Sequence, residues 1–288
     1  LPASLPFFDG FEEGFVWNVL PSVNNSWYRG RAKPKDGIFS AYVSGNGGFT
    51  TDFNGSWTNI PAILELPINL AGFANVTVSF DWMLDGDIET TWGYVRMENG
   101  ANIAELSNPS KLANQRTWQK VESWNITTEN VFSSGSVLRF YMNINGGQTD
   151  IGFVLDNVQV TGTLKSVGSP QATNYGGLKN YITWRNAVND GSLEVVVVAL
   201  NSESPEIQAL ENGKKYRVGD LVNGGKIVYV GGGEKFIHEP VLGGKDYIYH
   251  IYQKNGLTYS TGVKTNSVST PENVVFYEDF ETESAWNI

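Results

Sequence analysis

The chain has 288 residues and no cysteine, which excludes structural disulfides, thiolate catalysis and cysteine-based zinc sites. Positive charge is also scarce, because 20 Lys and Arg stand against 30 Asp and Glu and leave a formal net charge of −10. A protein that binds phosphates or an anionic membrane surface gathers its basic residues into a stripe. The basic residues here are spread thinly, so we expect neither nucleic acid nor a membrane as a partner.

Long apolar runs are missing as well. The longest, Leu193 to Leu200, has the length of a strand, whereas a membrane-spanning helix needs roughly 18 apolar residues. Helical periodicity is not sustained in any segment. The chain opens at Leu1 without a charged and apolar leader, so we expect a mature or excised piece of a longer protein whose targeting signal lies outside it.

Glycine and aromatic residues are abundant, with 32 Gly, 9 Trp, 13 Tyr and 15 Phe, while only 17% of the residues are charged. Glycine forms turns, and aromatic side chains fit the half-buried faces of sheets. At about 150 residues per domain, the length predicts two domains. The composition therefore predicts an all-β protein built from sandwiches.

Residues 1–162 form a series of short alternating segments separated by Gly- and Asn-rich breakers. The segment from Val76 to Trp82 is the clearest example, because Val76, Val78, Phe80 and Trp82 share one face at a period of two and polar residues share the other. We expect the apolar face of each such segment to pack in the hydrophobic core. We expect a two-sheet sandwich here.

The stretch 163–174 carries Gly, Ser and Pro without apolar alternation and is predicted to be a linker. The residues after it differ in composition from the Trp-rich first half of the chain. Residues 175–270 contain short candidate strands. About seven strands in such a length is the count expected of an immunoglobulin-like sandwich.

The extreme C-terminus repeats the start of the chain. Residues 276–288 match residues 7–19 in the spacing of Phe, Phe-Glu and Trp-Asn. This long-period repeat predicts that residues 271–288 contain the first strand of a truncated further unit. A lone first strand exposes backbone donors and acceptors, so we expect residues 276–288 to pair with a neighbouring molecule.

Several motifs together resemble a known family. They are Phe7-Phe8-x-x-Phe11-Glu12, Trp27-Tyr28-x-Gly30, Gly37-x-x-Ser40-Ala41-Tyr42-Val43-Ser44, Ser79-Phe80-Asp81-Trp82, Tyr94-Val95-Arg96 and Phe153-x-Leu155-Asp156-Asn157-Val158. This set resembles the choice-of-anchor J and cleaved-adhesin domains, jelly-roll relatives of MAM domains in secreted proteins of the Bacteroidetes. Residues 175–270 resemble fibronectin type III-like modules through Tyr247-x-Tyr249-x-Ile251-Tyr252 and the segment 212–220.

The resemblance implies export to the cell surface or medium, commonly by type IX secretion, and a role in adhesion or carbohydrate binding. The expected partner is a glycan or a host or extracellular-matrix protein. Two alternatives stay open: a structural spacer that binds nothing, and an accessory region of a secreted hydrolase whose catalytic domain lies elsewhere. The chain departs from the adhesin pattern at Leu66-Pro67-Ile68, where a Thr-Pro motif is absent.

Carboxylates at two distant places suggest a metal site. Asp9 and Glu12 lie on the expected first strand, Asp156 lies on the expected last strand of the same domain, and Asp36-Gly37 lies in a loop. Calcium takes six to eight oxygen ligands and needs no His or Cys. The resemblance implies a structural calcium ion held here, and the alternative is a solvated acidic strand end.

Catalytic constellations are not recognisable. Asp85, Asp87 and Glu89 are typical of a polar loop, and Gly231 to Gly233 is predicted to be a hairpin turn because no Lys-Ser or Lys-Thr follows it. The histidines, His238 and His250, fall on candidate strands without a partner motif. We therefore expect a chain that is not an enzyme.

Tryptophans are the candidates for ligand contacts, because flat rings stack on sugar faces. Those expected near loops or strand ends, and assigned to ligand binding, are Trp57, Trp92, Trp118 and Trp124. Those expected in the core are Trp17, Trp27, Trp82 and Trp184. Packing is the alternative for each loop tryptophan, and a ligand patch needs two or three exposed together.

Overall fold

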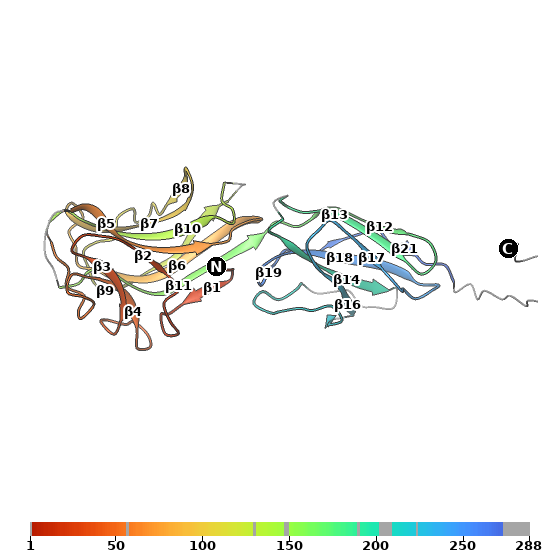
Figure 1. The fold of residues 1–288 in the computed structure, drawn as a ribbon, viewed down its shortest axis with the longest axis horizontal. Helices are drawn as coiled ribbons and strands as arrows, with labels where there is room; N and C mark the ends of the chain where they lie inside the picture. Colours follow the sequence, from red (N-terminus) through yellow and green to blue (C-terminus); the bar gives the residue numbers. More distant parts are fainter. Residues whose placement is uncertain are drawn as a thin grey trace, which may run out of the picture.

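The computed structural model of the chain describes residues 2–55, 58–128, 131–146, 150–188, 191–201, 209–222 and 224–272. The described residues form strands, turns and loops, with no helix among them. Two β-sandwiches lie one after the other along the long axis of the molecule (Figure 1). The predicted all-β fold class, a jelly-roll sandwich followed by a fibronectin type III-like sandwich, is confirmed.

The first sandwich consists of two antiparallel sheets. The first sheet follows the order β3-β4-β11-β6-β9, with β1 beside β11. Its strands are β1 (Phe7–Asp9), β3 (Ser26–Gly30), β4 (Ser40–Ser44), β6 (Phe73–Leu84), β9 (Gln115–Thr127) and β11 (Val154–Leu164). The second sheet follows the order β2-β5-β10-β7-β8. Its strands are β2 (Asn18–Leu20), β5 (Thr58–Ile68), β7 (Thr91–Asn99), β8 (Asn102–Glu105) and β10 (Ser136–Ile144).

An aromatic cluster fills the space between these two sheets. Phe140 of β10 lies at its centre, with its ring centroid 5.0 Å from that of Phe80, 5.8 Å from that of Trp17 and 6.3 Å from that of Phe153. Val76, Val78 and Phe80 of β6 are fully buried, as the period of two predicts. Trp17, Trp27 and Trp82 are also buried. The expected core face of the first domain is thus confirmed.

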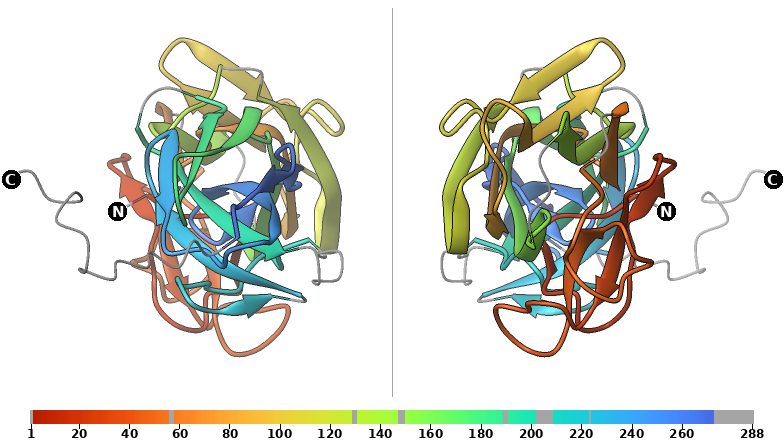
Figure 2. Two further views of the ribbon diagram at one scale, coloured as in Figure 1. Left: turned by 90° about the vertical axis from the view of Figure 1, so that its right-hand side faces the viewer. Right: turned by 90° about the vertical axis from the view of Figure 1, so that its left-hand side faces the viewer.

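The outward faces of the two sheets differ. The outward face of the first sheet carries a smaller apolar cluster in which Tyr42, Met83 and Val154 are buried and Tyr28 and Trp118 pack against them. The second sheet presents alternating polar and aromatic residues outward instead, and its β7–β8 hairpin stands at the outer edge of the molecule (Figures 1 and 2). This second outward face holds the candidate site.

The second sandwich pairs a small sheet with a large one. The small sheet has the order β12-β13-β17, and the large one has the order β15-β16-β14-β18-β19, with β20 and β21 also beside β18. The strands are β12 (Gly168–Asn174), β13 (Asn180–Arg185), β14 (Glu194–Asn201), β15 (Leu221–Val222), β16 (Gly225–Gly231), β17 (Lys235–His238), β18 (Asp246–Asn255), β19 (Thr258–Tyr259), β20 (Val263–Lys264) and β21 (Val268–Ser269).

The large sheet of the second sandwich is buried on both faces. Val195 and Val197 face the core shared with Trp184. Val196 and Val198 point the other way and pack against residues of the segment 209–222, among them Leu210 and Tyr216. This arrangement explains the continuous apolar run of β14, because a strand covered on both faces has no polar side.

Two local predictions in this region are wrong. The expected linker 163–174 contains the end of β11 and all of β12, so that only residues 165–167 separate these two strands. Strand β12 lies at a sheet edge and buries only Ala172 fully, and for this reason it shows no apolar alternation. The expected hairpin turn at Gly231–Gly233 instead connects β16 of the large sheet to β17 of the small one.

Hydrogen bonds join the two sandwiches. The buried side chain of Asn255, at the end of β18, donates from Nδ2 to the carbonyl oxygen of Ala71 at 2.8 Å. Nearby, the backbone N–H of Lys165 donates to the carbonyl oxygen of Gly72 at 2.9 Å. The turn 69–72 of the first sandwich is therefore bonded to the second sandwich and to the chain that enters it.

The expected truncated unit at 271–288, with its pairing strand 276–288, lies outside the described residues apart from Pro271 and Glu272. The truncated repeat and the pairing of its strand with a neighbouring molecule therefore stay predictions. Across the described ranges, no helix has the length and apolar character to cross a membrane.

Replacing Phe140 tests the aromatic core. We expect Phe140→Ala to lower the free energy of unfolding by about 3–5 kcal/mol, because it removes a fully buried ring from the centre of the cluster and leaves a cavity. The matched control is Phe49→Ala, since Phe49 is 87% exposed and its loss should change stability by less than about 0.5 kcal/mol. Equal effects of the two substitutions in chemical denaturation would contradict this account.

Candidate functional site

The carboxylates predicted as metal ligands accept hydrogen bonds from the chain between β3 and β4. Asp156 of β11 is fully buried, and its Oδ2 accepts the backbone N–H groups of Lys35 at 2.9 Å and Asp36 at 3.3 Å. Burial raises the pKa of Asp156, while these backbone hydrogen bonds oppose the rise. The Oε1 atom of Glu12 accepts the N–H groups of Ile38 and Phe39, each at 2.9 Å, and these bonds lower the pKa of Glu12.

Basic and amide groups occupy the space around the same carboxylates. Lys35 Nζ lies 2.8 Å from Oδ1 of the buried Asp81. Asn157 Nδ2 donates to Asp81 Oδ2 at 2.9 Å and to Asp36 Oδ2 at 2.8 Å. Arg29 donates to the carbonyl oxygens of Phe11 and Glu12. Lys35 and Arg29 therefore offset part of the negative charge of this acidic region.

Asp9 and Gly37 have separate local roles. Asp9 accepts the N–H of Phe11 at 2.6 Å and the indole N–H of Trp17 at 2.9 Å, and so it closes the turn after β1. Gly37 has a φ of +66°, and an added Cβ would lie 2.6 Å from Cδ of Glu12. Glycine is needed at this position because Glu12 lies against the backbone.

These residues are not arranged as a calcium shell in this structure, and the calcium ion implied by the resemblance stays a prediction. The described ranges contain no group of three or more His, Cys, Asp and Glu side chains placed to hold a metal ion. The oxygens of Asp9 and Asp156 accept N–H groups, and Lys35 pairs with Asp81. The arrangement fastens the 31–39 connection to the sheet, and nothing in the function proposed below depends on a metal.

The tryptophans predicted to bind a ligand do not come together. Trp124 is 8% exposed and belongs to the core between the sheets, so its assignment to a ligand surface is wrong. Trp118 packs against the apolar cluster on the outward face of the first sheet. Trp92 lies on β7 in the second sheet, and Trp57 lies outside the described residues. Of the three described tryptophans, Trp92 belongs to the surface developed below.

A pocket of about 340 Å³ lies on the outward face of the second sheet around Trp92. Trp92, Tyr94 and Arg96 alternate with fully buried residues along β7, so all three side chains point to the same side. We call this surface, together with its neighbours from β8, β10 and the 106–114 connection, the β7–β10 face. Its pocket residues are Trp92, Tyr94, Arg96, Glu105, Lys111 and Asn143.

Stacked rings and cations give the β7–β10 face its shape. The rings of Tyr94 and Tyr141 are parallel to within 4° with centroids 4.4 Å apart. The guanidinium of Arg96 lies 4.9 Å from the Tyr94 ring centroid and pairs with Glu105 at 2.6 Å. Lys111 Nζ lies 4.2 Å from the ring centroid of Trp92. The result is a wall of flat groups with polar edges.

A charged network holds the side chain of Tyr141 in place. Arg139 pairs with Glu65 at 2.6 Å and with Glu98 at 2.5 Å, and the Tyr141 hydroxyl donates to Glu98 Oε1 at 2.5 Å. Both glutamate side chains are only 12% exposed. Burial and the Glu98 carboxylate raise the pKa of Tyr141 to about 12. The Tyr94–Tyr141 stack is therefore held by partly buried, charged partners.

One atom of the pocket has an unused hydrogen-bonding capacity. Asn143, which faces Trp92 across the β10–β7 pairing, has a buried Nδ2 that finds no hydrogen-bond partner in the described structure. Leaving a buried amide donor unsatisfied costs about 1–3 kcal/mol. Sequence reasoning missed Asn143, because a single Asn on a strand carries no signal; the alternation of Trp92, Tyr94 and Arg96 was the available clue.

The remaining titratable residues have structural partners. Asp85 pairs with Arg116 at 2.6 Å, and Asp87 accepts the N–H of Glu89 at 2.8 Å in a turn, as expected of a polar loop. His250 is buried on β18. His238 of β17 lies between the sheets of the second sandwich, where desolvation and the charge of Lys226 lower its pKa to about 4.

Comparison with known proteins gives structural similarities only. No family model and no curated protein matches the chain. The CBM22-1 xylan-binding domain of Paenibacillus barcinonensis Xyn10C is 14% identical over 56% of this chain and 97% of its own, with a TM-score of 0.37. The K3 cleaved adhesin domain of Lys-gingipain from Porphyromonas gingivalis w83 is 15% identical over 55% of this chain and 99% of its own, with a TM-score of 0.32.

The tandem CBM22-1–CBM22-2 domain of the same Xyn10C is 11% identical and covers 98% of this chain and 94% of its own, with a TM-score of 0.36. The Bacteroidetes origin implied by the sequence motifs stays a prediction.

The effect of calcium on stability tests the acidic region. Because N–H groups and Lys35 already satisfy these carboxylates, we expect the unfolding temperature to be the same in millimolar calcium and in excess chelator. The measurement is thermal unfolding followed by circular dichroism. A rise of several degrees with calcium that disappears in Asp156→Asn would instead support the structural calcium ion implied by the resemblance.

A pH titration tests the environment of His238. Its pKa of about 4 lies below the ordinary value of 6.5, so the unfolded chain binds this proton more tightly than the folded one. The stabilising contribution is complete above pH 6.5, and we expect it to decline as the pH falls from 6.5 toward 4. Chemical denaturation across this range should show a shallower decline in His238→Asn, and identical slopes in the two proteins would contradict the assignment.

Proposed function

We propose that the β7–β10 face binds a glycan, and that the chain serves as a binding module of a larger secreted protein. The observation that carries this proposal is the wall of flat rings with polar edges around Trp92, in which Asn143 holds a buried Nδ2 that has no hydrogen-bond partner in the described structure. A ligand that offers an oxygen acceptor would remove the cost of leaving this donor without a partner. Sugar hydroxyls and ring oxygens are such acceptors.

The aromatic side chains supply the second requirement of a sugar site. A pyranose ring presents an apolar C–H face with hydroxyls around its rim, and it stacks on flat rings such as those of Trp92 and Tyr94. Arg96, Glu105 and Lys111 surround these rings with groups that donate to or accept from hydroxyls. A volume of about 340 Å³ lies at the lower end of the range for small-molecule sites.

Charge on the β7–β10 face favours an uncharged glycan. The three basic residues Arg96, Lys111 and Arg139 are balanced by the three acidic residues Glu65, Glu98 and Glu105. Arg96 and Arg139 are paired within the face, which leaves Lys111 over Trp92. An anionic polysaccharide would meet little net positive charge here.

Secretion and adhesion belong to the same proposal. The motifs that resemble cleaved-adhesin domains support export to a bacterial surface by type IX secretion, where a glycan or a matrix protein would be within reach, and a chain without cysteine is compatible with that route. A structural spacer is the second candidate, and the hydrogen bond from Asn255 to Ala71 favours it because this bond ties the two sandwiches together. In either role, an enzyme would have to lie elsewhere in the polypeptide.

A glycan panel with matched tryptophan variants tests the binding proposal. We would titrate the chain with neutral oligosaccharides, xylo-, cello- and manno-oligosaccharides among them, by calorimetry. For a sugar that binds, we expect Trp92→Ala to weaken the affinity at least tenfold, about 1.4 kcal/mol. Trp118→Ala on the opposite sheet is the control and should bind as the parent does. No binding to any glycan by the folded protein would favour the spacer.

Asn143→Leu separates binding from stability at the same site. The substitution keeps the shape of the side chain and removes the unsatisfied donor, so we expect the free protein to become more stable by up to about 1–3 kcal/mol. The same variant should bind the sugar several-fold more weakly. A loss of stability together with unchanged affinity would contradict both parts of this account. It would show that the unsatisfied Nδ2 does not destabilise the free protein and does not contact the ligand in the complex.

A further inference from the structure

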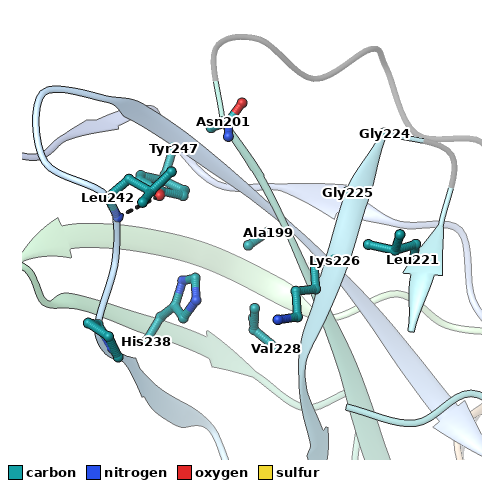
Figure 3. A pocket seen from close by; sticks show the side chains of 11 residues that line it. Ala199, Asn201, Leu221, Gly224, Gly225, Lys226, Val228, His238, Leu242 and Tyr247 are labelled. Atoms are coloured by element: carbon teal, nitrogen blue, oxygen red, sulfur yellow. Dashed lines mark hydrogen bonds between the residues drawn. The ribbon is translucent and has the colours of Figure 1, made fainter. Parts of the chain in front are cut away.

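A second pocket lies in the other sandwich, far from the β7–β10 face in the chain. It opens between β16 of the large sheet and β17 of the small sheet, and it has a volume of about 540 Å³ (Figure 3). The proposed function makes no use of it. Two of its polar side chains, Lys226 and His238, come from these two strands and approach the same space.

Hydrogen bonds determine which nitrogen of His238 carries the hydrogen. Asn180 Nδ2 donates to the hydroxyl oxygen of Tyr249 at 2.9 Å, which leaves the hydroxyl hydrogen of Tyr249 free to be donated onward. His238 Nδ1 lies 3.0 Å from that hydroxyl, and the neutral tautomer with its hydrogen on Nε2 allows Nδ1 to accept the hydroxyl hydrogen. With a pKa of about 4 the ring is neutral at pH 7, so its hydrogen is on Nε2, and Figure 3 shows the ring extending into the pocket.

Lys226 brings an unneutralised positive charge to the pocket. Its ammonium makes no ion pair with any side chain in the described part of the chain, although the protein as a whole carries a net charge of −10. The charge of Lys226 acts on His238, since it contributes to the lowered pKa of that ring. Two donors, the ammonium of Lys226 and the Nε2–H of His238, thus face one pocket, and within the described ranges neither is paired with a carboxylate.

Apart from Asn201, the remaining side chains of the pocket wall are largely apolar. Ala199, Val228 and Tyr247 belong to the edge of the core between the two sheets. Leu242 remains 60% exposed at the rim, although it is large and hydrophobic. The hydroxyl of Tyr247 accepts the backbone N–H of Leu242 at 2.9 Å, which fixes the Tyr247 side chain at the pocket rim. An apolar chain or ring would be buried here and would cover Leu242.

We propose that this pocket binds an amphipathic monocarboxylate, with the carboxylate on Lys226 and His238 and the apolar body along Val228, Leu242 and Tyr247. The carboxylate accepts one hydrogen bond from the ammonium and one from Nε2–H. A neutral sugar would leave the charge of Lys226 without a counter-charge in this pocket, whereas a carboxylate supplies one. The second sandwich thereby has a ligand class different from that of the β7–β10 face.

Octanoate is the probe that tests the proposal. We would follow binding to the full chain by calorimetry and by NMR chemical shifts of His238, and we expect a Kd below 1 mM at pH 7. Octanol has the same apolar body without the charge and should bind at least tenfold more weakly. Undetectable octanoate binding at millimolar concentration, or equal affinity for octanol, would overturn the proposal.

Matched lysine variants locate the charge. Lys226→Gln should weaken octanoate at least tenfold, whereas Lys235→Gln, on the exposed side of β17, should leave the affinity unchanged. Both positions are exposed, so neither substitution endangers the fold. Equal loss in the two variants would mean non-specific attraction and would overturn the assignment. Trp92→Ala should bind octanoate normally, so that failure of one pocket is distinguishable from failure of the other.

Discussion

Burial of one face of every long strand is the constraint on which this structure depends. In the first sandwich, the inward residues of β6, β7, β10 and β11 meet around Phe140, and each of these strands alternates between this core and an outer face. A shift of register by one residue would reverse the two faces. The core therefore determines which side chains are presented outward, including those that form the β7–β10 face.

The burial of one strand face explains how the outward face of a single sheet can form a binding surface without a cleft between two domains. Val95 and Met97 are fully buried, so Tyr94 and Arg96 between them must point outward on the same strand. The partly buried ion pairs of Arg139 beside Tyr141 then hold the rings in place at a cost in desolvation that apolar residues would avoid. Such an arrangement makes sense where the orientation of the rings matters more than stability.

The acidic region of the first sandwich and the buried polar chain of the second sandwich both satisfy polar groups through hydrogen bonds, but with different results. In the first sandwich, Asp156 and Glu12 receive the N–H groups of a long connection that has no strand to pair with. In the second, Tyr249 and Asn180 form a buried polar chain that ends at His238, where the sandwich opens. The first network closes a loop, whereas the second leaves its last donor facing a pocket.

The sequence by itself determined the all-β class, the two sandwiches, the core tryptophans Trp17, Trp27, Trp82 and Trp184, and the exclusion of cysteine chemistry. These follow from composition and from a period of two, which are local properties of the chain. The site did not follow, because it depends on which strands become neighbours. Trp92 and Asn143 are far apart in the sequence and meet only through the pairing of β7 with β10. Likewise, only the three-dimensional arrangement placed Trp124 in the core, gave the predicted calcium ligands N–H partners, and brought Lys226 to the same pocket as His238, since each depends on contacts that no local pattern records.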